Sequence, residues 1–139
     1  MRSELIDIAT GGTEVVFDLT SRCEQFVAAE AHQAQGDGLL HLFVPHATAG
    51  IAIIETGAGS DTDLLAVLEE LLPRDFGWRH RHGTPGHGRD HVVPALIPPY
   101  ASVPVLDRRL ALGTWQSICL VDTNVDNPRR QVRLSWLPG

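Results

Sequence analysis

The pattern of apolar positions along this chain predicts short strands near both ends, with helices between them. Leu5 to Ala9 and Glu14 to Phe17 are β-prone runs on either side of Gly11-Gly12, a pattern typical of a hairpin. Six further apolar runs, bounded by turn residues, are also expected to be strands: Leu39 to Val44, Ile51 to Ile54, Val103 to Leu106, Leu110 to Leu112, Trp115 to Val121 and Gln131 to Trp136.

Two segments carry apolar residues at helical spacing, and each opens with a capping-box pattern: Ser21 with Glu24, and Ser60 with Asp63. The first segment stops at Gly36 and the second at Pro73. His91 to Ile97 predicts a third, short helix, because Pro94 is tolerated only in a first turn. In the second helix the predicted buried stripe is Leu64, Val67, Leu68, Leu71 and Leu72.

Strands and helices in this order, without regular alternation of the two, indicate an α+β fold: a mainly antiparallel sheet packed against two main helices. The 139 residues fit a single domain, residues 1–139, of a size that can bury a core without disulfides. Between the second and third helices, Arg74 to Arg89 shows no periodicity. A segment of this length is too long for a passive connector, so we expect a mobile or functional loop.

Charge and residue types exclude several classes of function. The net charge of -6 argues against nucleic acid or an anionic membrane as a partner. Every cation is an arginine, which excludes Schiff-base chemistry and a phosphate loop of the Gly-Lys-Ser type. Cys23 and Cys119 lie in apolar patterns and are expected to be buried thiols. Since no signal-peptide core and no apolar run of ~20 residues occurs, the protein is expected to be cytoplasmic.

The stretch from Val44 to Glu55 is the first candidate for a functional site. His46 lies on the connection between two strands, where a side chain is accessible and its position is fixed. Glu55 ends the second strand and shares a face with Ile51 and Ile53, which is costly for a carboxylate without a partner. The alternative is a solvated turn histidine and a carboxylate at a frayed strand end.

Four of the seven histidines fall within twelve residues: His80, His82, His87 and His91. Neutral imidazole is the commonest metal ligand, and an open catalytic zinc site takes three protein ligands and a water. Gly88 argues against a shared helical face for His87 and His91, so such a site would be assembled from separate loops. His32 and His41 are assigned to structure.

Several motifs follow one another along nearly the whole chain: His46-Ala-Thr-Ala-Gly-Ile with Glu55, the helix from Asp63-Leu-Leu to Leu-Leu-Pro73, Arg79-His80, Asp90-His91, Leu112-Gly-Thr-Trp-Gln116 and Asp126-Asn-Pro-Arg-Arg130. Together they closely resemble the YjbQ family, also called UPF0047. The chain departs from the family pattern at His87-Gly-Arg-Asp-His91, where many members have an Asn-Ala-His-x-His-like string. The resemblance implies a single α+β domain, a homotrimer, and a cleft between subunits lined by histidines that hold a metal or an anion in some relatives.

The resemblance also implies an activity, because members are often labelled secondary thiamine-phosphate synthase. We therefore predict a metal-dependent enzyme with thiamine-phosphate-synthase-like activity on a small phosphorylated substrate in the inter-subunit cleft. The alternative is a non-catalytic binding or sensor protein for a small phosphorylated metabolite or a metal. The implied roles are ligation of a divalent metal, zinc, by His46, His80 and His91, catalysis by Glu55 and Asp63, and substrate binding by Thr48, Trp115, Gln116 and Arg130.

Three geometric expectations follow. His46, His80 and His91 should converge on one point, with His82 and His87 contributing much less. Trp115 and Gln116 should alternate along a strand and line a pocket or an interface. The trimer interface should use strands of the C-terminal half, because a short antiparallel sheet leaves edges that need covering.

Overall fold

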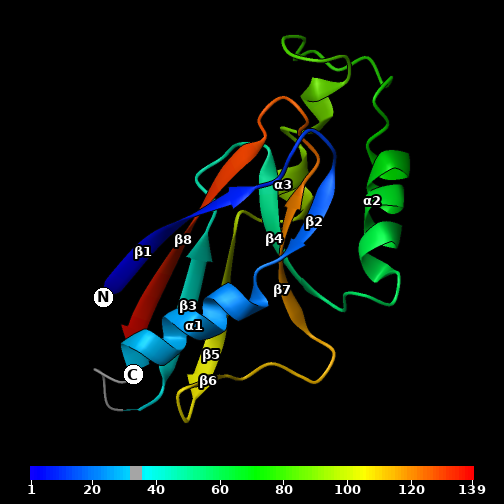
Figure 1. Cartoon of the computed structure of the whole chain (residues 1–139). Helices are drawn as coiled ribbons and strands as arrows, with labels where there is room; N and C mark the ends of the chain where they lie inside the picture. The colour runs from blue at the N-terminus through cyan, green and yellow to red at the C-terminus, as the bar shows by residue number, and fades with distance from the viewer. Residues whose placement is uncertain (32–35) are drawn as a thin grey trace.

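In the part of the chain that the structure describes, two antiparallel sheets and three α-helices make up the fold (Figure 1). The structure is a computed structural model and describes residues 1–31 and 36–139. The larger sheet has five strands in the order β1-β8-β3-β5-β6, and the smaller has three in the order β2-β7-β4. In chain order the elements are β1 (Arg2–Ala9), β2 (Val15–Asp18), α1 (Thr20–Ala31), β3 (Gly38–Phe43), β4 (Ala49–Ile54), α2 (Ser60–Leu71), the 3-10 helix η1 (His87–Arg89), α3 (Val93–Leu96), β5 (Tyr100–Leu106), β6 (Arg109–Leu110), β7 (Ser117–Asp122) and β8 (Arg129–Pro138).

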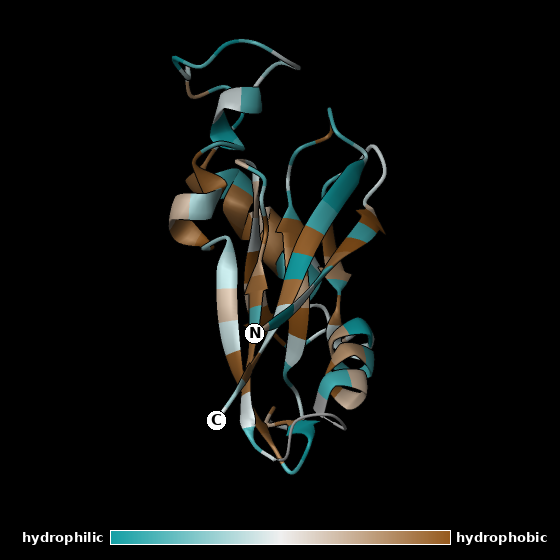
Figure 2. Ribbon diagram, turned by 90° about the vertical axis from the view of Figure 1, so that its left-hand side faces the viewer, coloured by the Kyte–Doolittle hydropathy of each residue, from teal (hydrophilic) through white to brown (hydrophobic). Residues whose placement is uncertain are grey.

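The predicted α+β class with antiparallel pairing is confirmed, although the strands divide between two sheets rather than one. Buried side chains alternate with exposed ones along β1, β3 and β5, whereas β7 is buried on both faces. Figure 2 shows brown bands alternating with pale and teal ones along several strands. Ile6 and Ile8 of β1, Leu134 and Trp136 of β8, and Val27 of α1 are all buried in one cluster.

The predicted hairpin at Gly11-Gly12 is wrong. β1 pairs with β8 in the larger sheet, whereas β2 pairs with β7 in the smaller one. The backbone N–H groups of Thr10 and Gly11 donate to the carbonyl oxygen of Pro128. The two glycines therefore carry the chain from one sheet to the other, and their turn is closed by the β7–β8 connection instead of by a neighbouring strand.

Both helix starts differ from the capping-box prediction. α1 begins at Thr20, whose N–H donates to the Asp18 carboxylate at 2.8 Å. α2 begins at Ser60 after the left-handed Gly59, without a side-chain cap. The predicted stripe on α2 is only partly buried, because Leu68 and Leu72 are covered whereas Val67 is 51% exposed and Leu71 is 64% exposed. One apolar edge of α2 therefore faces outward.

Three other local predictions hold. The turn at Asp107-Arg108 is tight, with φ of 48° and 62° at those two residues. The third helix, Val93–Leu96, carries its proline in the first turn. Cys23 and Cys119 are buried free thiols, and burial raises the pKa of each to about 12, so both are unreactive.

Of the two histidines assigned to structure, His41 lies in β3 with its Nδ1 at 2.9 Å from the Ser102 hydroxyl, as a strand residue in a cross-strand contact. His32 lies outside the described residues. Among the described residues, no helix is long and apolar enough to cross a membrane.

Several connections meet at one end of the molecule. The β1–β2, β3–β4 and β7–β8 connections lie at the upper end in Figure 1, together with the irregular segment between α2 and α3. As predicted for Arg74 to Arg89, this segment, which spans residues 72–92, is without regular structure apart from the 3-10 turn at His87–Arg89. It is therefore positioned by loops of both sheets rather than by a helix or strand of its own.

Gly50 provides a test of how tightly α3 packs on the smaller sheet. A Cβ added at Gly50 would lie 2.1 Å from the Ile97 carbonyl oxygen, which is backbone and cannot rotate away. We expect Gly50→Ala to lower the free energy of unfolding by at least about 1–3 kcal/mol, the usual cost of overpacking. Urea denaturation measures this. Gly12→Ala is the control, because an added Cβ there meets nothing within 4 Å; equal losses in both variants would contradict the packing.

Candidate metal centre

A cluster of four imidazoles forms within the irregular segment. The histidine cluster consists of His80, His82, His87 and His91, whose candidate ligand nitrogens all lie within 4.8 Å of one another. The ring centroid of His80 lies 4.0 Å from that of His82 and 4.1 Å from that of His91. Nitrogens around a tetrahedral zinc are roughly 3.4 Å apart at zinc–nitrogen bonds near 2.1 Å. Small ring rotations would therefore bring these nitrogens into ligand positions.

Two glycines allow the segment to fold back on itself. A Cβ at Gly88 would lie 2.5 Å from Cβ of Trp78 and 2.7 Å from the His80 carbonyl oxygen. A Cβ at Gly83, where φ is +81°, would lie 2.9 Å from the His87 ring and 2.7 Å from an Asp126 carboxylate oxygen. These close approaches set the backbone of His80 against the turn that carries His87. Gly88 thus allows the close approach, and His87 Nε2 lies 3.0 Å from His91 Nε2 although the two residues share no α-helix, as expected.

Asp90 fastens this segment to the end of β7. Its side chain is fully buried, and its carboxylate accepts hydrogen bonds from the Thr123 hydroxyl at 2.8 Å and from the Asn124 amide at 3.2 Å. Burial raises the pKa of the Asp90 carboxyl, against these two hydrogen bonds, which lower it. The neighbouring Arg89 is also fully buried and pairs with Glu69. Side-chain hydrogen bonds and an ion pair, rather than the backbone hydrogen bonds of a helix or strand, therefore hold the cluster in place.

The cluster favours neutral imidazoles. The pKa of His80 and that of His91 are both lowered, first by partial desolvation and then by the neighbouring histidines, since a second positive charge nearby would be repelled. A neutral imidazole keeps one nitrogen lone pair. At neutral pH these two side chains can therefore bind a cation without first losing a proton.

A cavity of about 260 Å³ opens beside the cluster, with His80 and His87 in its wall. Two arginines also line it, Arg74 and Arg81. Arg74 pairs with Glu14, so much of its charge is already neutralised. Arg81 is exposed and lies one residue from His80, which makes it the cation placed to meet an anionic group next to the histidines.

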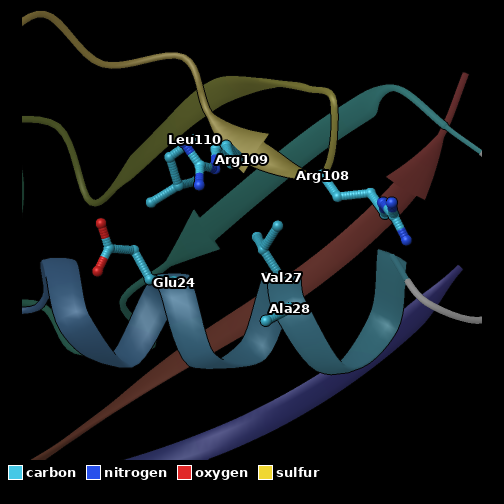
Figure 3. Close-up of a pocket in the computed structure, with 6 residues that line it drawn as sticks. All are labelled: Glu24, Val27, Ala28, Arg108, Arg109 and Leu110. Atoms are coloured by element: carbon cyan, nitrogen blue, oxygen red, sulfur yellow. The ribbon is translucent and has the colours of Figure 1, made fainter.

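A larger cavity, of about 450 Å³, lies between α1 and the β5–β6 hairpin (Figure 3). Val27, Ala28 and Leu110 contribute apolar surface to it. Its charged side chains are spread along the groove, with Glu24 toward one end of the view and Arg108 toward the other. No group of metal-ligating side chains among the described residues lies there, so the smaller cavity is the better candidate for chemistry.

Within one chain, His46 lies outside the histidine cluster, and its convergence with His80 and His91 between subunits stays a prediction. Its Nε2 accepts a hydrogen bond from the Gln131 backbone N–H at 2.9 Å. A neutral imidazole has a single lone pair, which this bond occupies, so Nδ1 carries the proton. While that bond is intact, His46 has no lone pair for a metal within its own chain.

Thr48 and Arg130 form a buried contact instead of an open phosphate site. The Arg130 guanidinium is bound by the Asp122 carboxylate, at 2.7 Å from Nε and 3.0 Å from Nη2, and it also donates to the Thr48 hydroxyl. Within one chain, a protein carboxylate thus occupies the Arg130 guanidinium that was expected to bind substrate. Breaking such a buried pair is costly, so its first role is to join β7, β8 and the His46 loop.

Glu55 and Asp63 lie at the opposite end of α2 from the histidine cluster. Both are exposed, Glu55 just after β4 and Asp63 in the first turn of α2, whereas the cluster follows the end of that helix. A helix of this length spans about 18 Å. Within one chain they therefore do not serve the cluster as catalytic groups.

Trp115 and Gln116 do not alternate along a strand, because β7 begins only at Ser117. They lie in a turn in which the Gly113 N–H donates to the Gln116 side-chain oxygen at 2.8 Å. Trp115 is 73% exposed. A role for these residues in an interface stays a prediction.

The sequence interpretation missed the residues that support the cluster. His82 and His87, expected to matter little, belong to it. Asp90, Asn124 and Asp126 were not singled out for the site, yet they hold the backbone and ring of His87. The available signal was the density of histidines itself. The contacts with residues 123–126 span more than thirty positions and have no local pattern.

Comparison with known proteins finds a family model described as UPF0047 protein YjbQ-like, which matches residues 4–139. A UPF0047 protein of Mycobacterium tuberculosis is 53% identical over 139 residues, covering 100% of each chain. The UPF0047 protein YugU of Bacillus subtilis is 33% identical over 129 residues, covering 89% of each. Among solved structures, a YbjQ-like protein of unknown function from Sulfolobus solfataricus has a TM-score of 0.89 at 25% identity, covering 99% of this chain and 97% of that one.

Proposed function

From its membership of the YjbQ-like UPF0047 family, to which this chain belongs, and from its histidine cluster, we propose that the protein is a metal-dependent enzyme acting on a small phosphorylated substrate. The observation that carries the proposal is the gathering of four ring nitrogens within 4.8 Å of one another, beside a cavity with an arginine in its wall. An all-nitrogen donor set suits zinc among the common biological cations.

The ligands are not equivalent. His87 is buried and its ring is held by contacts to Asn124 and Asp126, whereas His82 is exposed. Three histidines bound to zinc leave a fourth position for water or substrate, as in catalytic sites, and four would close it, as in structural sites. We assign His80, His87 and His91 as the retained ligands, and His82 as the ligand that a substrate oxygen replaces.

The finer activity within this proposal is the thiamine-phosphate-synthase-like reaction that the family resemblance implies. Joining a pyrimidine diphosphate to a thiazole phosphate releases pyrophosphate, and a divalent metal bound to the cluster would neutralise the charge on that leaving group. Arg81 would bind a phosphate oxygen through its guanidinium, without any lysine. A metal-loaded protein with turnover far below ~1 per second on every thiamine precursor would instead favour the binding or sensor function.

Metal binding tests the cluster directly. Protein prepared without a polyhistidine tag should bind about one equivalent of zinc, measured by titration calorimetry and elemental analysis. His87→Ala and His91→Ala should each weaken binding at least tenfold, because they remove a ligand and leave fewer than four nitrogens. His41→Ala is the matched control, since His41 lies in β3 away from the cluster.

The same titration has an expected pH dependence. Because the pKa values of His80 and His91 are lowered, zinc affinity should be nearly constant above the ordinary imidazole value of about 6.5 and fall only as protons compete below it. Zinc binding that is unchanged in both His87→Ala and His91→Ala would contradict the metal centre.

Arg81 tests the phosphate site. Arg81→Ala should weaken pyrophosphate binding by the zinc-loaded protein about tenfold, because a charge-assisted hydrogen bond beside the metal is lost. Arg79→Ala is the matched control, an exposed arginine two residues away that does not line the cavity. Calorimetric titration with pyrophosphate measures both, and a larger loss in the Arg79 variant would place the anion elsewhere.

A homotrimer is part of the same proposal. It would cover exposed apolar side chains of the C-terminal half, such as Tyr100 and Leu106 of β5 and also Trp115. If Glu55 and Asp63 contribute to a cluster, it would have to be the cluster of another chain. Light scattering at micromolar concentration should give three times the chain mass of 15.1 kDa. A mass of one chain would rule out any site shared between subunits.

A further inference from the structure

The environment of the His87 ring points to Asp126 as a positioning residue that selects which ring nitrogen of His87 is free to bind a metal. We propose that the Asp126 carboxylate holds the proton on Nδ1 of His87 and thereby leaves the lone pair on Nε2, which faces the rest of the histidine cluster. The role of Asp126 in metal binding rests on the proposed metal centre. The tautomer of His87, however, is a property of the metal-free protein.

Two polar groups compete for His87 Nδ1. An Asp126 carboxylate oxygen, Oδ2, lies 2.8 Å from it, and the Asn124 amide nitrogen, Nδ2, lies 2.9 Å from it. If Nδ1 carries the proton, it donates to the carboxylate at the length of a charge-assisted hydrogen bond. If Nδ1 is bare, it accepts from Asn124, but two lone pairs then face each other across 2.8 Å.

The orientation of the Asn124 amide is fixed by its other contacts. Its oxygen accepts from the backbone N–H groups of Asp126 and Asn127, at 3.2 and 3.1 Å. Its nitrogen donates to the buried Asp90 carboxylate at 3.2 Å. Turning the amide over would break all three contacts, so the nitrogen stays toward His87. Asn124 therefore favours a bare Nδ1, and Asp126 is the group that opposes it.

The Asp126 carboxylate is itself held in position. The same oxygen that faces His87 also accepts from the Thr84 backbone N–H at 3.2 Å. Gly83, with φ of +81°, brings this backbone close enough, since a Cβ there would lie 2.7 Å from that oxygen. The carboxylate thus joins the β7–β8 connection to the histidine-bearing segment at the point where His87 is oriented.

The consequence concerns the opposite side of the ring. With the proton on Nδ1, Nε2 of His87 presents a lone pair 3.0 Å from Nε2 of His91 and can serve as a metal ligand. With the proton on Nε2, an N–H would point into the cluster and block ligation. A carboxylate–histidine–metal arrangement of this kind typically raises metal affinity 10–100-fold.

Two variants test separately the loss of the acceptor oxygen and the loss of its negative charge. Asp126→Ala removes the acceptor, so His87 should shift to the Nε2–H tautomer and zinc affinity should fall 10–100-fold. Asp126→Asn keeps an oxygen, which the Thr84 N–H orients toward His87, so the tautomer should be retained and the loss of affinity should be smaller. Asp75→Ala is the control, because it removes a carboxylate from the cavity wall that is not in contact with His87.

The readout is the pair of ¹⁵N chemical shifts of the His87 ring in metal-free protein, assigned with His87→Gln and paired with zinc titration of each variant. Wild type with protonated Nδ1, and Asp126→Ala with protonated Nε2, would support the proposal even if zinc failed to bind, in which case the metal centre alone would be wrong. The same tautomer in wild type and Asp126→Ala, or equal losses of zinc affinity in Asp126→Ala and Asp75→Ala, would overturn it. If Asp126→Ala does not fold, Asp126→Leu, which removes the acceptor but keeps much of the side-chain volume, takes its place, and a protonated Nδ1 in that variant would overturn the proposal as well.

Discussion

The buried carboxylate of Asp90 is the constraint on which the candidate site depends. A fully buried carboxylate is costly unless its oxygens are hydrogen-bonded, and here Thr123 and Asn124 supply those bonds from the end of β7. Because Asp90 lies between His87 and His91, satisfying it also fixes both histidines relative to the smaller sheet. A segment with almost no regular structure thereby gains a defined position, and Gly83 and Gly88 let it approach closely enough for four imidazoles to meet.

The two sheets and the irregular segment contribute different things to the proposed chemistry. β7 and β8 present a buried polar layer at one end of the molecule, in which Asp122 pairs with Arg130 and His46 is tied to the backbone of Gln131. This layer joins β7 to β8, and through the Asp122 contact to the Asn124 N–H it supports the loop that holds His87. The irregular segment supplies what a phosphorylated substrate would meet: neutral imidazoles for a cation and Arg81 for an anion. The cationic groups of the proposed chemistry thus lie outside the buried layer.

The sequence predicts most of the fold and only half of the candidate site, for physical reasons. Period-two and helical patterns are local, so most strands, all three helices and the Asp107-Arg108 turn follow from them. Strand partners are not local, which is why Gly11-Gly12 suggested a hairpin although it joins two sheets. The density of histidines indicated a metal site, and family motifs drew attention to His46 instead of His82 and His87. The lone pair of His46 is used by a backbone N–H 85 positions away, a contact that no spacing rule reveals.

X-ray absorption spectroscopy at the zinc edge, on tag-free protein loaded with one equivalent of zinc, tests the central claim most directly. A centre built by the histidine cluster predicts a first shell of three or four imidazole nitrogens at about 2.0 to 2.1 Å, with any remaining position taken by a single oxygen. The multiple-scattering signal of imidazole should fall by one ring in His87→Ala. A shell made mainly of oxygens, or one that is unchanged in that variant, would contradict the account.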